Sequence, residues 1–460
     1  MNGDAAIAQW LGQWGEFQTD PSLMIPDEQA ESILGRVAER LRDNYPFPHP
    51  VYAGQMLKPP HAIAQAAYAL AMWINPNNHA LDGGPATAAM ERETIRALAT
   101  MVGYDPETAL GHLNSSGTIA NLEALWIGRE LAPGKAVASS AGAHYTHSRM
   151  CGVLGIPHVV IPTDRYGRID CAALEHALAD GNIGTVVATL GTTSLGSIDD
   201  LARILDLARA IGTRVHVDAA YGGFFRLIAE TGILSDYSAA ALRAMALADS
   251  IVIDPHKHGL QPYGCGSVLF RDAGVGRFYK HDSPYTYFTS DDLHLGEISL
   301  ECSRAGASAA ALWATLQAFP LTPEGLGRIL ARTRTAAMDF ARLLGASGQF
   351  RLVTEPELDI VCFYPVGGSP LPVSEISVWS ERIFEAGMKP TPDAFFLAKL
   401  TMNESELPVT GHPGLVWDAP RVTVLRSVLM KPEHADFAPA LVARIVAAAR
   451  SSDPAQSQRG

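Results

Sequence analysis

Short apolar runs alternate with segments of helical periodicity through the middle of the chain, from about residue 65 to residue 320. Five runs rich in β-branched residues predict buried strands, at 136–138, 159–161, 185–189, 215–217 and 251–253. A helix predicted over about 199–211 keeps its apolar residues on one face and takes Asp199 or Asp200 as its N-cap. Strands that alternate with helices in this way predict an α/β fold, with a mostly parallel central sheet flanked by helices.

The pattern changes on both sides of this region. Residues 1–65 mix helical and extended segments and end in repeated prolines. Beyond Pro320, helical stretches near 324–344, 374–386 and 434–450 enclose extended runs at 360–364 and 422–425. We therefore expect four parts, namely an N-terminal segment over 1–65, a large domain over 66–320, a smaller C-terminal α+β domain over 321–450 and a polar, disordered tail over 451–460.

Composition narrows the class of protein. The chain has 460 residues, 47% of them hydrophobic and 18% charged, which is enough apolar material for large buried cores. A net charge of -13 without any Lys/Arg-rich run argues against a nucleic-acid partner. The five cysteines are scattered and form no CxxC pair, so we expect neither a disulfide framework nor a zinc site. The start of the chain lacks the pattern of a signal peptide, and the apolar stretch 62–74 is too short to cross a bilayer. We expect a cytoplasmic protein without a membrane partner.

The segment from Val215 to Phe270 holds two candidates for chemistry. Asp218 follows a predicted strand, and ligands of open α/β sheets bind beyond the carboxyl ends of the strands. Capping of the next helix is the alternative role for Asp218. Lys257 follows the next predicted strand in the sequence DPHKHG, where it is either a surface charge or a desolvated amine that attacks a carbonyl group. Its two flanking histidines and its expected place in the same crevice as Asp218 favour the second role.

A third candidate is the small, hydroxyl-rich turn from Asn114 to Thr118, which opens a predicted helix. Free backbone N–H groups at a helix start, together with Ser and Thr hydroxyls, form a site for a phosphate dianion. An ordinary N-cap is the alternative for such a turn. The lysine and the acid elsewhere in the sequence favour the phosphate site.

Five motifs occur in a fixed order: NSSGTIANL, AHYTHS, ATLGTTSLGSID, HVDAAYGG and DPHK. With them the chain resembles the group II pyridoxal-phosphate-dependent amino-acid decarboxylase family, of the aspartate-aminotransferase-like fold (fold type I). The resemblance extends from His49 to Asp436. The stretch DPHK-x-G-x-x-PY, from Asp254 to Tyr263, is more similar to the bacterial and archaeal tyrosine decarboxylases than to the animal aromatic decarboxylases. The resemblance implies pyridoxal 5'-phosphate as cofactor and conversion of an L-amino acid to its amine and CO2.

The resemblance also implies the cofactor contacts. Lys257 carries the cofactor as a Schiff base, Asp218 pairs with the pyridine nitrogen, and His144 stacks on the ring. The remaining implied contacts are those of Ser116, Gly117 and Thr118 with the phosphate, His256 near the phosphate, Ala220 on the other ring face and Thr193 near the phenolic oxygen. The family's usual Thr-Ser-Gly-Gly-Thr is here Asn114-Ser-Ser-Gly-Thr, which leaves open whether side chains or backbone amides bind the phosphate.

On the substrate side, the resemblance makes Tyr263 the first candidate for the proton donor to the substrate carbon, with Tyr285 and Tyr287 as alternatives on a loop. It makes Arg426 the partner of the substrate carboxylate, whereas Arg304 is expected to be structural. Tyr52, Gln55 and Met56 of HPVYAGQM should line the substrate side and suit a flat, partly apolar side chain.

An aromatic substrate such as tyrosine is therefore expected, and three alternatives remain. An acidic substrate (aspartate, glutamate or cysteine sulfinate) needs a further cation, and Lys58 is the only near one. Oxidative conversion to an aldehyde is favoured if the proton-donating tyrosine is missing. A non-catalytic sensor of pyridoxal phosphate would keep the cofactor residues alone. The resemblance implies a homodimer with the active site near the subunit interface. His144 and His147, three residues apart, have no third ligand nearby in sequence, so no metal site is expected.

Overall fold

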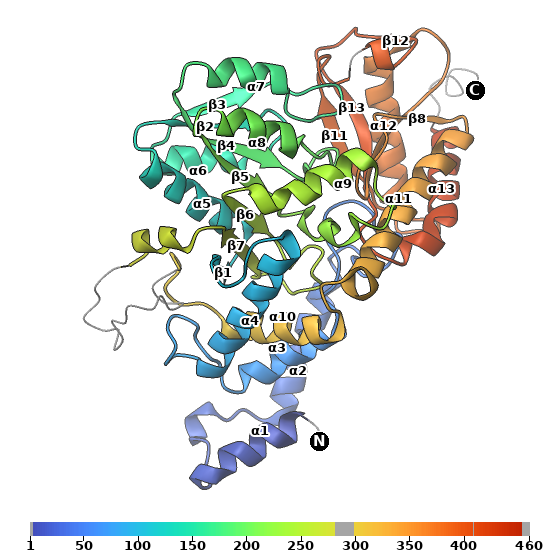
Figure 1. Cartoon of the computed structure of the whole chain (residues 1–460). Helices are drawn as coiled ribbons and strands as arrows, with labels where there is room; N and C mark the ends of the chain where they lie inside the picture. The colour runs from blue at the N-terminus through green and yellow to red at the C-terminus, as the bar shows by residue number, and fades with distance from the viewer. Residues whose placement is uncertain (1–2, 281–298, 408, 453–460) are drawn as a thin grey trace.

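The computed structural model describes residues 3–280, 299–407 and 409–452, which fold into two lobes around two separate sheets (Figure 1). Tyr285, Tyr287 and the last eight residues of the predicted tail lie outside the described residues. The N-terminal helices project from the larger lobe, next to α3 and α10 (Figure 1). Among the described residues, no helix combines the length and apolarity that a bilayer crossing requires.

The larger lobe contains a seven-stranded sheet in the order β1-β7-β6-β5-β4-β2-β3. All neighbouring pairs are parallel except those of β7, which is antiparallel to both β1 and β6. The mostly parallel sheet expected from the sequence is thus confirmed. The strands are β1 (Leu110–Asn114), β2 (Ala136–Ser140), β3 (His158–Ile161), β4 (Ile183–Thr189), β5 (Arg214–Asp218), β6 (Ser250–Ile253) and β7 (Gly266–Phe270).

The five predicted strands are β2 to β6, and two further strands escaped prediction. β1 has the sequence LGHLN, and its glycine, histidine and asparagine hide the apolar pattern of a strand. β7 follows a glycine-rich turn and was not separated from the lysine loop before it. β1 is the edge strand and β7 is its neighbour, on the side of the sheet that carries the antiparallel pairs.

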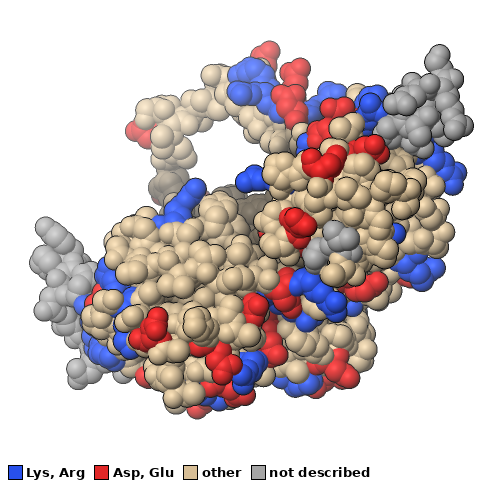
Figure 2. All heavy atoms as spheres, turned by 90° about the horizontal axis from the view of Figure 1, so that it is seen from above, with Lys and Arg blue, Asp and Glu red and all other residues tan. Residues whose placement is uncertain are grey.

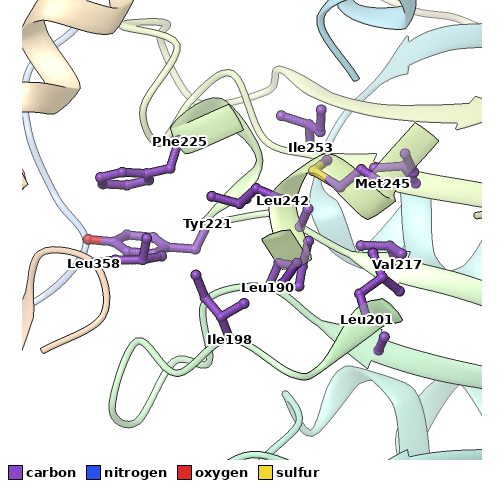
Figure 3. Close-up of a cluster of buried hydrophobic side chains, with 14 of the residues drawn as sticks. Leu190, Ile198, Leu201, Val217, Tyr221, Phe225, Leu242, Met245, Ile253 and Leu358 are labelled. Atoms are coloured by element: carbon purple, nitrogen blue, oxygen red, sulfur yellow. The ribbon is translucent and has the colours of Figure 1, made fainter. Parts of the chain in front are cut away.

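Helices cover both faces of this sheet (Figure 1). α5 packs against β1 and β4 to β7 with α6 beside it, whereas α7, α8 and α9 pack together on the other face, as right-handed crossovers require. Leucine, isoleucine and aromatic side chains on this second face form a continuous buried core (Figure 3). The helices are α1 (Gly3–Leu11), α2 (Asp27–Leu41), α3 (Ala62–Met72), α4 (Pro85–Val102), α5 (Gly117–Leu131), α6 (Thr146–Leu154), α7 (Cys171–Leu178), α8 (Leu201–Arg209), α9 (Asp236–Arg243), α10 (Gly306–Ala318), α11 (Arg328–Ala346), α12 (Val373–Gly387) and α13 (His434–Ser451).

The two aspartates before α8 have separate roles. Asp200 is the N-cap, because its side chain accepts a hydrogen bond from the backbone N–H of Arg203. Asp199 is fully buried and accepts the backbone N–H groups of Ile169 and Thr189 instead. Asp199 therefore joins the end of β4 to the segment that leads into α7. This contact fixes the position of Thr189 at the end of β4.

The smaller lobe contains a four-stranded antiparallel sheet in the order β11-β13-β9-β8, with a separate parallel pair β10-β12. Helices α11, α12 and α13 supply apolar side chains to one core with this sheet. α11 begins at Arg328, four residues later than predicted, because the backbone is irregular at Gly325. The strands are β8 (Phe350–Leu352), β9 (Ile360–Pro365), β10 (Leu371–Pro372), β11 (Ala398–Met402), β12 (Leu415–Val416) and β13 (Val422–Val428).

Acidic and basic side chains are interspersed over the face of the molecule that Figure 2 shows. No continuous basic surface is visible on that face. On that face, the acidic side chains are not concentrated in one patch.

Candidate active site

A cavity lies where β4, β5 and β6 end, between the N-terminus of α5 and the loop that follows β6. This is the edge of an α/β sheet at which ligands bind. All nine residues expected to contact the cofactor line it: Ser116, Gly117, Thr118, His144, Thr193, Asp218, Ala220, His256 and Lys257. The structure thus brings together residues that are up to 141 positions apart in the sequence, from Ser116 to Lys257.

Asp218 is the last residue of β5, beside Thr189 at the end of β4. Its carboxylate does not cap the following helical turn, whose N-cap is Gly222. Its Oδ1 accepts the N–H of Ala220 at 3.1 Å, and its Oδ2 lies 2.9 Å from His147 Nε2. Burial alone would raise the pKa of Asp218, but the hydrogen bond and charge of His147, the charge of Lys257 and the Ala220 N–H together hold it well below its ordinary value. The cavity therefore contains a buried, ionised carboxylate.

Lys257 lies in a tight turn directly after β6. Its backbone N–H donates to the carbonyl of Asp254, and its Nζ lies 3.1 Å from Asp254 Oδ2. The two flanking histidines diverge from it: His256 bonds the carbonyl of Cys265 through Nδ1, at 2.8 Å, whereas His258 is fully buried and faces Asp359 of the smaller lobe. The amine is thus held at the cavity by a carboxylate and is not a free surface charge.

The N-terminus of α5 faces the same cavity. Ser116 is its N-cap and accepts the N–H of Ile119 at 3.4 Å, so the N-cap role and a phosphate-binding role are compatible. Gly117 permits a close approach here, because a Cβ at this position would lie 2.5 Å from Asp254 Oδ2. The helix start therefore presents N–H donors to the cavity without a side chain in the way.

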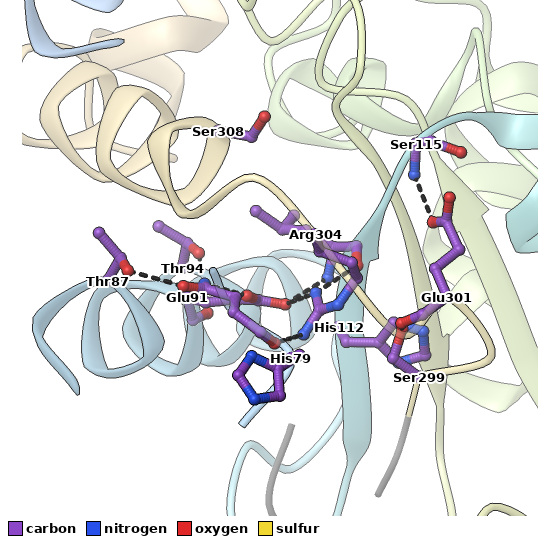
Figure 4. A network of polar contacts seen from close by, with 12 residues as sticks. His79, Thr87, Glu91, Thr94, His112, Ser115, Ser299, Glu301, Arg304 and Ser308 are labelled. Carbon is purple, nitrogen blue, oxygen red and sulfur yellow. Dashed lines mark hydrogen bonds and ion pairs between the residues drawn. The ribbon is translucent and has the colours of Figure 1, made fainter. Parts of the chain in front are cut away.

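A buried polar network supports this turn from behind (Figure 4). Arg304 forms an ion pair with Glu91 at 2.5 Å and donates to the carbonyls of Leu113 and Asn78. Beside it, the N–H of Ser115 donates to Glu301 at 2.8 Å. These contacts fix the end of β1 and the turn before α5, which is the structural role expected of Arg304.

His144 and His147 have different surroundings. His144 precedes α6 and bonds Thr146 through Nδ1 at 2.6 Å, and burial lowers its pKa, so it is a neutral ring at the cavity wall. His147 is in the first turn of α6, is fully buried, and contacts Asp218. Within the ranges that the structure describes, no group of three or more His, Cys, Asp or Glu side chains is arranged to hold a metal.

The expected substrate-side residues are next to this cavity and not in its lining. Arg426 is buried in β13, and its Nε donates to the carbonyl of Ser194 at 3.0 Å, next to the cavity residue Thr193. Its Nη1 donates to the carbonyl of Gly54 at 3.2 Å. The Tyr263 hydroxyl donates to the carbonyl of Met56 at 3.3 Å, and its ring lies 5.0 Å from that of His256.

The segment from Gly54 to Met56 thus connects Arg426 to Tyr263. Gln55 is exposed, and its backbone N–H donates to the hydroxyl of Tyr52. Tyr52 itself is buried among aromatic rings, 4.8 Å from Phe47 and 6.1 Å from Phe396 between centroids. An aromatic cluster therefore packs against the segment that connects Arg426 to Tyr263.

Five further polar residues that line the cavity were not expected from the sequence: Asn121, Thr146, Thr189, Tyr221 and Asp254. His147, which lies behind Asp218, was not expected there either. Asp254 had a signal, because it starts the DPHK motif. Thr189 Oγ1 and Asp254 Oδ1 are buried without a hydrogen-bond partner in the described structure. An amine, an ionised carboxylate, a neutral imidazole, unpartnered hydroxyl and carboxylate oxygens and an open helix N-terminus fit a ligand with an aldehyde, a ring nitrogen and a phosphate.

Comparison with known proteins agrees with this donor set. Residues 17–365 match the family model described as the pyridoxal-dependent decarboxylase conserved domain. The chain is 29% identical to an L-tyrosine decarboxylase of Enterococcus faecium over 429 residues, covering 72% of this chain and 70% of the relative. It is 33% identical to a probable L-aspartate decarboxylase of Halobacterium salinarum over 308 residues, covering 66% of this chain and 80% of the relative.

Solved structures agree on the fold. A crystal structure of Oryza sativa TDC with PLP and tryptamine has a TM-score of 0.77 at 20% identity and covers 95% of this chain and 91% of that chain. The crystal structure of mouse CSAD in apo form has a TM-score of 0.75 at 22% identity, with the same coverage of both chains. The expected fold type I architecture is confirmed.

Proposed function

The chain belongs to the pyridoxal-dependent decarboxylase family, and from that premise we propose that it decarboxylates an aromatic L-amino acid, with tyrosine as the first candidate. Membership makes the protein a pyridoxal 5'-phosphate-dependent amino-acid decarboxylase. The gathering of all nine expected cofactor residues around one cavity is the observation that carries the assignment of roles.

When bound, pyridoxal 5'-phosphate would supply an aldehyde that captures amino groups and a protonated ring that accepts the electron pair left on the substrate when CO2 departs. We assign Lys257 Nζ to the aldehyde and the Asp218 carboxylate to the ring nitrogen, because both face the cavity. His144 and Ala220 would hold the two faces of the ring, and Thr193 would lie near its phenolic oxygen. Ser116, Gly117 and Thr118 would bind the phosphate through the N-terminus of α5, with His256 nearby.

Arg426 is the proposed partner of the substrate carboxylate. Its guanidinium is held by the carbonyls of Ser194 and Gly54, while its Nη2 is buried without a partner in the described structure. A buried, unpaired N–H of a charged group is costly and is satisfied by a carboxylate. A substrate held there at one end would direct its side chain toward the segment that carries Tyr52, Gln55 and Met56.

The charges around the segment that carries Tyr52, Gln55 and Met56 favour a substrate with an aromatic side chain. An acidic side chain would need a cation besides Arg426. Burial lowers the pKa of Lys58 to about 8 against the opposing charges of Asp359 and Glu433, so its charge already has acidic partners. The Lys431 amine is engaged as well, because its Nζ bonds the carbonyl of Tyr52 at 2.5 Å. The buried rings around Tyr52 suit a flat, apolar group instead.

An acidic amino acid is the second candidate, since one similar protein is an L-aspartate/L-glutamate decarboxylase of Pyrococcus horikoshii, at 29% identity. The variant Lys58→Met separates the two. For an aromatic substrate we expect kcat/KM with L-tyrosine to stay within about threefold, because no contact to the substrate is lost.

For an acidic substrate, L-aspartate would be preferred by the wild type, and its kcat/KM would fall by about tenfold or more in Lys58→Met. Lys399→Met is the control for loss of a lysine, because Lys399 is a surface residue whose amine pairs with Glu381. A preference for aspartate that collapses only in Lys58→Met would overturn the aromatic assignment.

Tyr263 is the proposed proton donor to the substrate carbon. Its ring lies beside that of His256, and its hydroxyl donates to Met56 of the segment that also contacts Arg426. Tyr263 is 60% exposed, and partial desolvation together with the nearby Tyr52 and Asp254 raises its pKa above an ordinary value that already keeps the hydroxyl protonated at neutral pH. A donor that returns the proton to the substrate, and not to the cofactor, favours amine release over transamination.

We also propose a homodimer with the active site near the subunit interface. Helices α1 and α2 contain no buried residue, and large apolar side chains on this segment are exposed, with Trp14 at 69% and Phe17 at 83%. Exposed apolar surface of this extent is typical of a protein interface. Size-exclusion chromatography with light scattering would show a dimer, and a monomer at micromolar concentration would contradict it.

A further inference from the structure

We propose that His147 is a positioning residue that keeps Asp218 ionised and aimed at the cofactor's ring nitrogen by donating one hydrogen bond. The proposal rests on the role of Asp218 proposed above and adds a residue that the sequence motifs do not assign. Its basis is the geometry behind the cavity, on the face of the sheet that α5 and α6 cover.

The contact joins two elements of the larger lobe. His147 is fully buried in the first turn of α6, and its Nε2 lies 2.9 Å from Oδ2 of Asp218 at the end of β5. The other carboxylate oxygen accepts the N–H of Ala220. Among the described residues, His147 supplies the one side-chain hydrogen bond to this carboxylate, so the orientation of the carboxylate depends on it.

The surroundings of His147 fix which nitrogen donates. Its Nδ1 is buried and has no hydrogen-bond partner in the described structure. A proton on Nδ1 would leave a buried donor unsatisfied, whereas a proton on Nε2 lies directly between the ring and Asp218. The proton on Nε2 is therefore the one that points at the carboxylate.

The other ionisable groups around this pair do not replace it. His216, two residues before Asp218 on β5, bonds Ser250 and Asn121, and burial lowers its pKa to about 3. His144 before α6 and His158 on β3 also have pKa values lowered by burial. Lys257 is the remaining cation, and its Nζ lies 3.1 Å from Asp254.

This arrangement has a consequence for the loaded enzyme. When the cofactor is bound, Lys257 would no longer carry a free ammonium group, so the charge that it contributes to Asp218 would depend on the protonation of the bond that it forms. The hydrogen bond from His147 is then the principal remaining side-chain contact that opposes the burial of the carboxylate. Without this hydrogen bond, burial would shift Asp218 toward its neutral form. A neutral carboxyl group stabilises the proton on the ring nitrogen less than a carboxylate does.

Substitutions of His147 isolate the donor. In His147→Gln the side-chain amide nitrogen occupies nearly the place of Nε2 and keeps a neutral donor, whereas His147→Leu removes it. His158→Leu is the matched control, because it removes a partly buried histidine that bonds Ser139 and not Asp218. Asp218→Asn is the reference for loss of the carboxylate.

Each protein is loaded with pyridoxal 5'-phosphate labelled with ¹⁵N in the ring, and the ¹⁵N chemical shift is followed against pH. We expect the ring nitrogen to stay protonated in the wild type, in His147→Gln and in His158→Leu. In His147→Leu it should lose its proton within the pH range in which the protein stays folded. Turnover with substrate should show the same order, with kcat lowered about tenfold in His147→Leu at nearly constant KM.

The outcomes separate this inference from the proposed function. A ring nitrogen that stays protonated in Asp218→Asn would refute the role of Asp218 itself. A nitrogen that titrates in Asp218→Asn but stays protonated in folded His147→Leu would overturn the role of His147 alone. If His147→Leu does not fold or bind the cofactor, His147→Gln decides, because a folded Gln variant that loses the ring proton contradicts a hydrogen-bond donor at this place.

Discussion

At the scale of single residues, the chemistry of the site follows from what surrounds each charged group. Asp218 is buried, yet it stays ionised because donors surround it, whereas the His144 ring is kept neutral by burial. Lys257 is held at the cavity by Asp254, which itself has an unpartnered oxygen. Aspartate, histidine and lysine also occur on the surface of the protein. Asp218, His144 and Lys257 are candidates because of their surroundings and not because of their residue type.

Tyr263 is tested by Tyr263→Phe. This variant keeps the ring contact with His256 and loses only the hydroxyl. We expect normal cofactor binding but a fall in amine formation of about a hundredfold or more, because general acid catalysis contributes on that order. Amine and the transamination product are both quantified by mass spectrometry after incubation with substrate.

Tyr166→Phe is the control, since this tyrosine lies on a surface loop beside Arg165 and Arg168 and does not line the cavity. Amine formation by Tyr263→Phe within threefold of the wild type would contradict its role as proton donor. Tyr285 and Tyr287 would then be the next candidates.

The sequence motifs predicted nine of the fifteen residues that line the cavity, because a fixed order of short segments marks the ends of successive strands. His147 was noticed only as a histidine three positions after His144, and its contact with Asp218 could not be predicted. That contact depends on how α6 packs over β5, which local pattern does not determine. The contacts of Arg426 with Gly54 and Ser194 depend in the same way on the packing of the two lobes.

At the scale of elements, the N-terminus of α5 is the part of the site that is most sensitive to added volume. A Cβ at Gly117 would lie 2.5 Å from Asp254 Oδ2 and 2.9 Å from Oδ1. Gly117→Ala should therefore displace either the helix start or Asp254, and weaken cofactor binding about tenfold or more, which is about 1.4 kcal/mol. Titration of the cofactor-free protein with pyridoxal 5'-phosphate, followed by protein fluorescence, measures this affinity.

Gly152→Ala is the matched control in α6, since a Cβ there meets nothing within 4 Å. It should leave the affinity unchanged and raise helix stability slightly. Equal affinities for the two variants would show that the close approach at Gly117 does not matter for the phosphate.

The prediction of elements succeeded where the pattern was simple. The buried parallel strands β2 to β6 are continuous apolar runs, and they were found with their ends one or two residues short. β1 was missed because an edge strand with glycine and polar residues lacks that run, and β7 was missed because it was not separated from the glycine-rich turn before it. β1 nevertheless leads directly into the turn before α5, so the missed strand positions part of the site.

At the scale of the whole molecule, a buried polar cluster joins the two lobes near the cavity. Asp359 of the smaller lobe accepts the Tyr221 hydroxyl at 2.5 Å and lies 3.4 Å from His258 Nε2, both in the larger lobe. Burial raises the pKa of Asp359 to about 6, although Tyr221 and the charge of Lys58 oppose this shift. The carboxylate is thus less favourable in the folded protein than in the unfolded chain.

The sign of the pH dependence follows. A carboxyl group with a raised pKa in the folded state contributes stability that is present below about pH 4 and is lost as the pH rises through about 6. Asp359→Asn cannot ionise. Relative to this variant, the wild-type free energy of unfolding should fall by about 3 kcal/mol between about pH 4 and about pH 7.

Urea denaturation of both cofactor-free proteins across this range measures the difference. Asp180→Asn, at an exposed position, is the control and should run parallel to the wild type. Parallel curves for Asp359→Asn and the wild type would contradict a raised pKa at the boundary between the lobes.

The central claim is decarboxylation of an aromatic L-amino acid at the cavity of Lys257, and product analysis tests it most directly. The purified holoenzyme is incubated separately with each standard amino acid, DOPA and cysteine sulfinate, and CO2 and amine are measured, with Lys257→Ala as the inactive control. We expect tyramine from L-tyrosine, with kcat/KM at least about tenfold above that for any acidic amino acid. Preferred release of CO2 from aspartate, glutamate or cysteine sulfinate, an aldehyde as product with consumption of oxygen, or no CO2 from any amino acid would contradict the claim.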